Sequence, residues 1–171
     1  MSTELTTRLV LNLSATHTEA ATLSTPYPKD KPEIDASATL ADGTGANQAD
    51  YIYHGRVALV ANASQLHCGD GSLLDKFRNA QTFASVRAVV VKNRSTTAGE
   101  YIQVFGGVTD LAEWGEDKCG PGGVLIKTAP VDSIPVTGST YGITLSAVAS
   151  GATLNADMMI VGCSLWQPHN E

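Results

Sequence analysis

Four histidines and three cysteines are the residues with the clearest capacity to bind a metal ion. The histidines are far apart in the chain, at His17, His54, His67 and His169. A metal site on a β-sheet fold needs two or three imidazoles and a carboxylate that converge from neighbouring strands. His67 and Cys68 are adjacent, but adjacent residues of a strand point to opposite faces. We therefore expect Cys68 to be a small buried apolar residue and His67 to face solvent.

Nucleophilic catalysis has no clear sequence signal. The Gly-x-Ser-x-Gly motif of serine hydrolases is absent, and the run GDGS at residues 69–72 resembles it only loosely. Nothing in the sequence pairs Cys119 or Cys163 with a base. The glycine pairs and runs at residues 106–107 and 120–123 lack the Lys-Ser/Thr of a phosphate-binding loop. We expect no enzyme activity and no cofactor.

Three carboxylates, Glu113, Glu116 and Asp117, surround Trp114. Paired carboxylates beside an aromatic ring can form a glycosidase or sugar-binding site. Acidic residues in a glycine-bounded loop are more often a solvated surface. We expect Trp114 to bind a partner, and Trp166, just after the last expected strand, to pack a sheet edge or a subunit contact.

Composition and charge limit the classes of partner. The chain has 171 residues and a net charge of −6, and its basic residues form no dense cluster, which disfavours nucleic acid and anionic membranes. An odd number of dispersed cysteines indicates a protein made in a reducing cytoplasm. The N-terminal residues contain no long apolar run, so we expect no signal peptide, and no stretch approaches the ~20 residues of a spanning helix.

Apolar periodicity predicts an all-β fold. Patterns with a period near two, bounded by Gly, Asn, Asp and Pro, predict strands at residues 5–13, 34–40, 51–61, 82–92, 101–105, 124–128, 134–136, 140–148 and 157–165. Residues 82–92 carry valine on both faces, as in a central strand, and 101–105 would be their hairpin partner. Ser72 would cap one short helix over about 72–79. A two-sheet β-sandwich of jelly-roll type fits this pattern, and an up-and-down barrel is the alternative.

The domain organisation follows from the prolines. Residues 1–32 would be an N-terminal strand and an extended arm, and residues 33–171 the sandwich. Pro26, Pro28 and Pro32 stiffen the arm and remove backbone donors, and Tyr27 between them offers an apolar anchor. Tyr27 and Pro28 would therefore contact a neighbouring subunit or another surface. The alternative is that residues 15–31 loop over their own sandwich.

A set of segments resembles the capsid decoration, or cement, proteins of tailed bacteriophages. These segments are DGTGANQAD at 42–50, LLDKF at 73–77 and TFASVRAVVVKN at 82–93. The later PGG turn at 121–123 and the strand DMMIVG at 157–162 are similar too, so the resemblance spans residues 42–165.

The resemblance implies a non-catalytic jelly-roll protein of the virion. Such a protein is made in the bacterial cytoplasm and binds the outer surface of the major capsid protein lattice as a homo-oligomer, with a trimer preferred to a dimer. Two other classes stay open. One is a sugar- or receptor-binding module of a phage appendage that uses Trp114. The other is a small metal enzyme that uses His54 and His67.

Overall fold

The structure is a computed structural model that describes residues 6–14, 33–59, 63–74, 78–104, 117–129, 131–137, 142–148 and 153–164. Every regular element in these residues is a β-strand, which confirms the all-β class. None of them is a helix long and apolar enough to cross a membrane. The strands are β1 (Thr7–Ser14), β2 (Glu33–Leu40), β3 (Tyr51–Leu59), β4 (Ala63–His67), β5 (Leu73–Leu74), β6 (Ala80–Gln81), β7 (Phe83–Asn93), β8 (Tyr101–Val104), β9 (Asp117–Cys119), β10 (Val124–Thr128), β11 (Ile134–Pro135), β12 (Gly142–Val148) and β13 (Leu154–Ser164).

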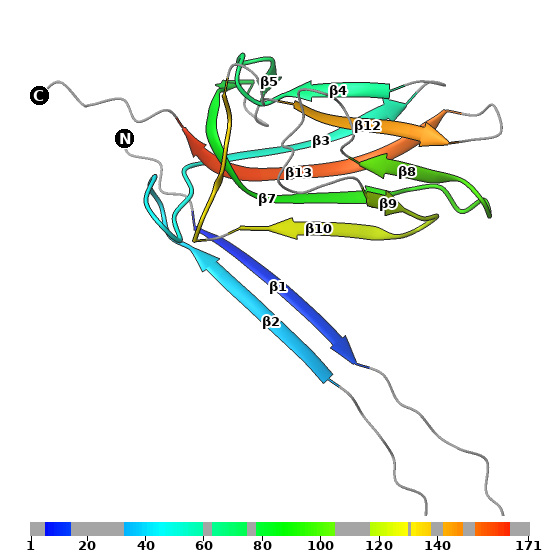
Figure 1. Ribbon diagram of the computed structural model, residues 1–171, viewed down its shortest axis with the longest axis horizontal. Helices are drawn as coiled ribbons and strands as arrows, with labels where there is room; N and C mark the ends of the chain where they lie inside the picture. Colours follow the sequence, from blue (N-terminus) through cyan, green and yellow to red (C-terminus); the bar gives the residue numbers. More distant parts are fainter. Residues whose placement is uncertain are drawn as a thin grey trace, which may run out of the picture.

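Two antiparallel sheets form the body of the molecule (Figure 1). Sheet I has the order β10-β7-β13-β3, with β11 also paired to β7, and sheet II has the order β4-β12-β8-β9. The sheets pack face to face, as in a β-sandwich, because strands of both contribute to one buried apolar cluster. The predicted two-sheet architecture therefore describes this part of the chain.

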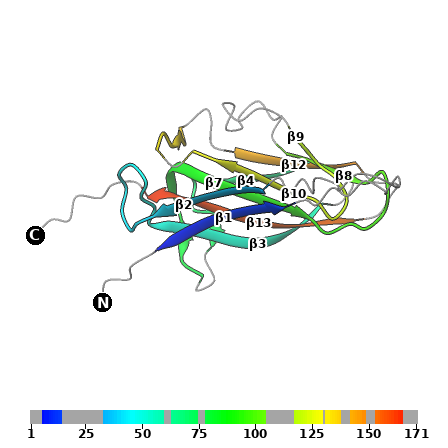
Figure 2. The same cartoon turned by 90° about the horizontal axis from the view of Figure 1, so that it is seen from below.

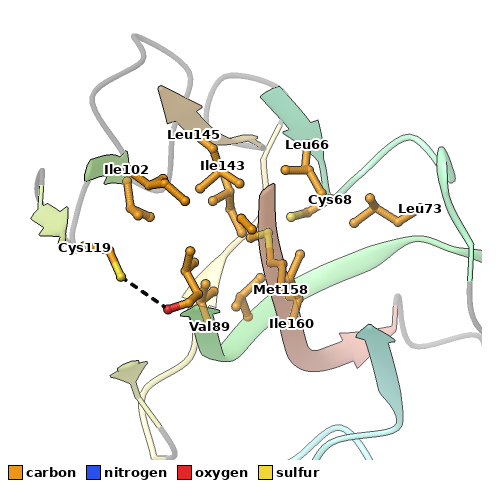
Figure 3. Packing of buried hydrophobic residues seen from close by; sticks show 14 of the residues in the cluster. Leu66, Cys68, Leu73, Val89, Ile102, Cys119, Ile143, Leu145, Met158 and Ile160 are labelled. Atoms are coloured by element: carbon orange, nitrogen blue, oxygen red, sulfur yellow. Dashed lines mark hydrogen bonds between the residues drawn. The ribbon is translucent and has the colours of Figure 1, made fainter. Parts of the chain in front are cut away.

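The core between the sheets follows the alternation of each strand. In β13, Ala156, Met158 and Ile160 are fully buried and belong to the cluster between the sheets. Met158 lies beside Ile143 of sheet II, and Leu145 belongs to the same cluster (Figure 3). The three cysteines are free and buried, and the Cys119 thiol lies 3.7 Å from the Val91 carbonyl oxygen. Cys68 is fully buried in this cluster, as its position next to His67 predicted.

Strand β7 is the predicted central strand. It pairs with β13 on one side and with β10 and β11 on the other. Its register with β13 shifts between Val161, opposite Ala88, and Gly162, opposite Val86. Arg87 is therefore the extra residue of a β-bulge, which bends the strand and redirects its side chain.

Two local predictions, the helix over 72–79 and its cap at Ser72, differ from the structure. In place of the helix over 72–79, Leu73–Leu74 forms β5 and pairs with β6, while residues 75–77 lie outside the described residues. The Ser72 N–H donates to Asp70 Oδ1 at 2.9 Å, so this serine closes a turn after Asp70 and caps no described helix.

The predicted hairpin between 82–92 and 101–105 is wrong, because β8 belongs to sheet II. The connection after β7 passes from one sheet to the other and is held by its own polar groups. The fully buried Asn93 donates to the Cys119 carbonyl at 3.1 Å and accepts from the Ser95 N–H at 2.9 Å. Ser95 Oγ in turn donates to Glu100 at 2.6 Å. These bonds replace the ladder that a hairpin would have made.

Strands β1 and β2 form a separate two-stranded ribbon. In Figure 1 the ribbon leaves the body below β10 and runs away from the sheets at an angle, and in Figure 2, seen from below, it therefore lies in front of the sheets. The pairing joins a strand of the expected arm to residues expected in the sandwich. The boundary between residues 32 and 33 stays a prediction.

The bulge provides a test of the fold. A Cβ at Gly162 would lie 2.2 Å from the Ser85 carbonyl oxygen and 2.8 Å from the Phe83 side chain. The added methyl group of Gly162→Ala must therefore displace the β7 backbone at Ser85 and the Phe83 ring. We expect it to lower the free energy of unfolding by about 2 kcal/mol and the melting temperature by about 4–8 °C. Gly120→Ala is the matched control, since nothing lies within 4 Å of its added Cβ. Equal melting temperatures for the two variants in thermal denaturation would contradict the bulge geometry.

Candidate interaction surface

The residues that the sequence singled out for partner binding are Tyr27, Pro28, Trp114 and Trp166, and all lie outside the described residues. The same holds for His17, His169, Glu113 and Glu116. Of the acidic residues near Trp114, Asp117 is described, and its carboxylate forms an ion pair with the Lys127 ammonium on β10. This carboxylate has a structural partner in the sandwich.

The two described histidines lie on opposite outer faces of the sandwich. His54 is exposed on β3, between Tyr53 and Gly55, on the side away from the core. His67 follows the core residue Leu66 on β4, and its side chain is 38% exposed. The two imidazoles therefore cannot share a metal ion. Among the described residues, no group of three or more His, Cys, Asp or Glu could hold one.

His67 belongs to a small polar turn. Its Nδ1 lies 3.8 Å from Asp70 Oδ2. Hydrogen bonds from the Ser72 side chain and backbone lower the pKa of Asp70, and the neighbouring His67 adds to this. The Ser72 hydroxyl donates to the His67 carbonyl at 3.4 Å, so these groups bond to one another within the turn. By contrast, burial alone raises the pKa of the Tyr53 hydroxyl.

The most highly constrained polar region is residues 41–50, the base loop, which connects the ribbon to β3. The Ala41 N–H donates to the Asn47 carbonyl at 3.0 Å, and the Ala49 N–H donates to the Ala41 carbonyl at 2.8 Å. The Gly45 N–H donates to Gln48 Oε1 at 2.7 Å. Gly43 has a φ of 129° and Asn47 a φ of 54°, values that glycine and asparagine tolerate best. The loop is thus a closed, internally bonded turn, and its glycines and Asx residues are the types that favour turns.

The end of β13 holds the base loop from one side. The Asp50 carboxylate accepts hydrogen bonds from the Ser164 N–H, at 2.6 Å, and from the Ser164 hydroxyl. The Asp50 N–H donates to the Gly162 carbonyl at 3.2 Å. The Cys163 thiol donates to the Gln48 carbonyl at 3.4 Å. Backbone and side chains of three consecutive residues therefore fix the loop to sheet I.

Arg87 holds the base loop from the other side. It is 4% exposed, and its guanidinium donates to the Gly45 carbonyl at 2.8 Å and to the Val131 carbonyl at 2.7 Å. Burying a guanidinium is costly unless carbonyls or carboxylates accept its hydrogen bonds, and charge-assisted bonds are the strong ones. The bulge in β7 thus directs one cation to join two loops that are far apart in the sequence.

An apolar cluster completes the base of the ribbon. Leu40, the last residue of β2, is fully buried with Ala49, Ala88 and Val161, and Ile52 and Met159 pack against them. These partners lie on the outer face of sheet I, the face turned away from the core. The ribbon is therefore attached to sheet I by one buried leucine and by the base loop.

Beyond this cluster, the outer face of sheet I carries a group of apolar side chains and, next to it, a group of charged side chains. Met159 lies opposite His54 and Val90, and Val90 lies opposite Ile126, which is 41% exposed. Val124, 53% exposed, lies opposite Lys92. Next along the face, Asp157 forms ion pairs with Arg56 on β3, at 3.1 Å, and with Arg94 after β7. The face thus offers exposed aliphatic side chains beside an excess of cations.

Comparisons of the chain with known protein families, with curated proteins and with solved structures find no match.

The groups that hold the base loop, Arg87, Asp50 and Ser164, were missed by the sequence reasoning. A signal for Arg87 was present, because it is the one charged residue inside the apolar run from Phe83 to Val91. A charge at the centre of a buried strand must find acceptors. The sequence does not reveal which carbonyls accept its bonds.

The ion pairs of Asp157 generate a pH prediction. Hydrogen bonds from Arg56 first, and then from Arg94, lower the pKa of this carboxyl group in the folded protein. Its ionisation therefore stabilises the fold above the unfolded-state pKa of about 3.9, and this contribution is lost as the pH falls through the lower folded-state value. We expect Asp157→Asn to melt at a lower temperature than the parent at pH 6, and the difference to shrink as the pH falls toward 3.

Thermal denaturation across this pH range measures the effect, with Asp132→Asn as the control at an exposed aspartate. A difference between parent and Asp157→Asn that stays constant from pH 6 to pH 3 would show that the carboxylate charge is not what stabilises this part of the sheet.

Proposed function

We propose that the sandwich is a jelly roll and that the protein decorates and stabilises the outer surface of an icosahedral phage capsid by binding, without catalysis. The nested strand order supports the jelly roll. β3 pairs with β13, β4 with β12, β7 with β10, and β8 with β9, so early strands pair with late ones and the innermost pair is nearly consecutive. A chain folded in half and then rolled gives this order.

The observation that carries the binding role is the ribbon. A two-stranded ribbon alone is marginally stable, and this one pairs with no other described strand. Its base, in contrast, is fixed by a buried cation, a buried leucine and a carboxylate bonded to β13. Such an extension gains most of its stability when another molecule covers it, which suits a protein whose task is to join subunits.

The segment between the two ribbon strands supports an anchoring role for Tyr27. Ser14, at the end of β1, lies opposite Glu33, at the start of β2. Ser14 and Glu33 therefore form the last pair of the ribbon, at the end opposite to the Thr7–Leu40 pair beside the base loop. Many copies bound to one shell would multiply weak contacts of this kind through avidity.

The first test is the copy number of the protein in purified virions. On this proposal, quantitative mass spectrometry finds it in a simple ratio to the major capsid protein, because every equivalent position of the lattice is occupied. Only a handful of copies per particle would assign the protein to a tail or neck and contradict the proposal.

The second test is Tyr27→Ala. We expect the melting temperature of the free protein to change little, and binding to heads that lack the protein to weaken at least about fivefold, as loss of an aromatic contact predicts. Val148→Ala, on an exposed position of sheet II, is the control and should bind like the parent. Co-sedimentation with heads measures both. Unchanged binding of Tyr27→Ala would overturn the anchoring role.

A further inference from the structure

Three cations meet on the outer face of sheet I. Lys92 of β7 lies opposite Asp157 of β13, and Asp157 in turn lies opposite Arg56 of β3. Arg94, two residues beyond Lys92, pairs with the same carboxylate. No other carboxylate occurs in the described strands of sheet I. Arg56, Lys92 and Arg94, the cation row, therefore place three positive charges around one negative charge, in a chain whose net charge is −6.

Both arginines keep donors for a further acceptor. Asp157 Oδ1 accepts a hydrogen bond from Arg56 Nε at 3.1 Å, and Asp157 Oδ2 accepts one from Arg94 Nη1. These are the hydrogen bonds of the two guanidinium groups within the described part of the chain, and a guanidinium has five N–H donors. The two side chains are 59% and 45% exposed. Asp157 thus orients two guanidinium groups at the surface and leaves most of their donors available.

Lys92 adds a cation without a carboxylate of its own. It is exposed, and within the described residues Asp157, which lies opposite, pairs with the two arginines and not with this lysine. Lys127 of β10, in contrast, pairs with Asp117. The cation row therefore lacks the negative charge that would balance it, and a carboxylate of another molecule can supply that charge.

Aliphatic side chains lie next to the cation row. Val124 lies opposite Lys92 and is 53% exposed, and Ile126 lies opposite Val90 and is 41% exposed. A phosphate backbone or a free anion would bind the cations but leave these aliphatic side chains in water. A protein surface that carries both carboxylates and aliphatic groups covers both, as protein interfaces combine an apolar centre with a polar rim. The mixture therefore favours a protein as the partner.

The ribbon leaves this part of the sheet uncovered. Leu40 packs on Ala88 and Val161, which are two residues along their strands from Val90 and Met159. Beyond that contact the ribbon runs away from the sheets (Figure 1). The base of the ribbon, the aliphatic side chains and the cation row are thus successive levels of one sheet face, and the last two stay exposed.

We propose that this part of sheet I, the docking face formed by Arg56, Lys92, Arg94, Val124 and Ile126, binds an acidic and aliphatic surface of the capsid lattice. Carboxylates of the lattice accept hydrogen bonds from the two arginines and pair with the lysine, and its aliphatic side chains cover those of β10. The inference rests on the proposed decoration role for the identity of the partner. It adds which face of the sandwich contacts the lattice and what chemistry the lattice presents there.

Charge reversal tests the polar half of the docking face. Binding of the full chain to heads that lack the protein is measured by co-sedimentation at low ionic strength, where exposed charges are screened least. Lys92→Glu should raise the Kd at least about tenfold, because it puts a carboxylate where carboxylates of the partner bind. Lys118→Glu makes the same change of charge at an exposed position of sheet II and should bind like the parent.

Ile126→Ser tests the aliphatic half. We expect it to raise the Kd at least about threefold, because the serine buries less apolar surface against the partner. Val148→Ser is the matched control, since Val148 on sheet II is also 41% exposed. Thermal denaturation establishes that each variant is folded, and Ile126→Ser keeps the test valid if Lys92→Glu does not fold.

The outcomes separate the docking face from the decoration role. A parent that binds heads, with a folded Lys92→Glu or Ile126→Ser that binds equally well, overturns the docking face and leaves the decoration role intact. A parent that does not bind heads contradicts the decoration role, and the proposed partner with it. Retardation of duplex DNA by the parent that is lost in Lys92→Glu would assign the cation row to nucleic acid and overturn the proposal as well.

Discussion

The position of the ribbon depends on one buried guanidinium. Arg87 emerges from the bulge of β7 and donates to the Gly45 and Val131 carbonyls, so it joins the base loop to the segment between β10 and β11. Without it, the loop would keep the bonds of Asp50 to β13 and the packing of Ala49 on Ala88, but lose its hydrogen bond to β7. Because β1 and β2 pair with no other described strand, this attachment and Leu40 determine the direction in which the ribbon leaves the body.

The β-bulge between β7 and β13 affects both the core and the base of the ribbon. Gly162 lets β13 approach Ser85 so closely that a Cβ would not fit, and the residue gained in β7 is Arg87. On one side of the two strands, Val86, Val89, Met158 and Ile160 fill the core. On the other, Ala88 and Val161 receive Leu40. Sheet I therefore packs against sheet II on one face and against the base of the ribbon on the other.

Alternation of apolar residues predicted the fold class, because β3, β7 and β13 each pack one or two faces against the rest of the fold and the period of these faces is visible in the sequence. Which strands pair with each other was harder to predict from the sequence. The sequence predicts a hairpin for residues 101–105 because they follow β7 at a short distance. The Asn93 bond that helps to hold the connection to the other sheet joins residues 26 positions apart, a contact that the sequence does not reveal. Leu73 and Leu74 suit a helix as well as a strand, and the turn at Asp70 decided between them. The sequence shows that Arg87 is an unusual charge within an apolar strand, but it does not show which carbonyls accept its hydrogen bonds. For Tyr27, Pro28, Trp114 and Trp166 the sequence remains the only guide.

Hydrogen exchange with and without phage heads that lack the protein tests most directly whether a fixed base presents the ribbon for binding. The amides of Ala41 and Ala49, bonded within the base loop, should be protected to the same degree in both samples, because their bonds lie within one chain. On the proposed decoration role, the amides of β1 and β2 should gain protection when heads are added. Base-loop amides that exchange as fast as those of the exposed turn at 96–99, or ribbon protection that heads do not change, would contradict the account.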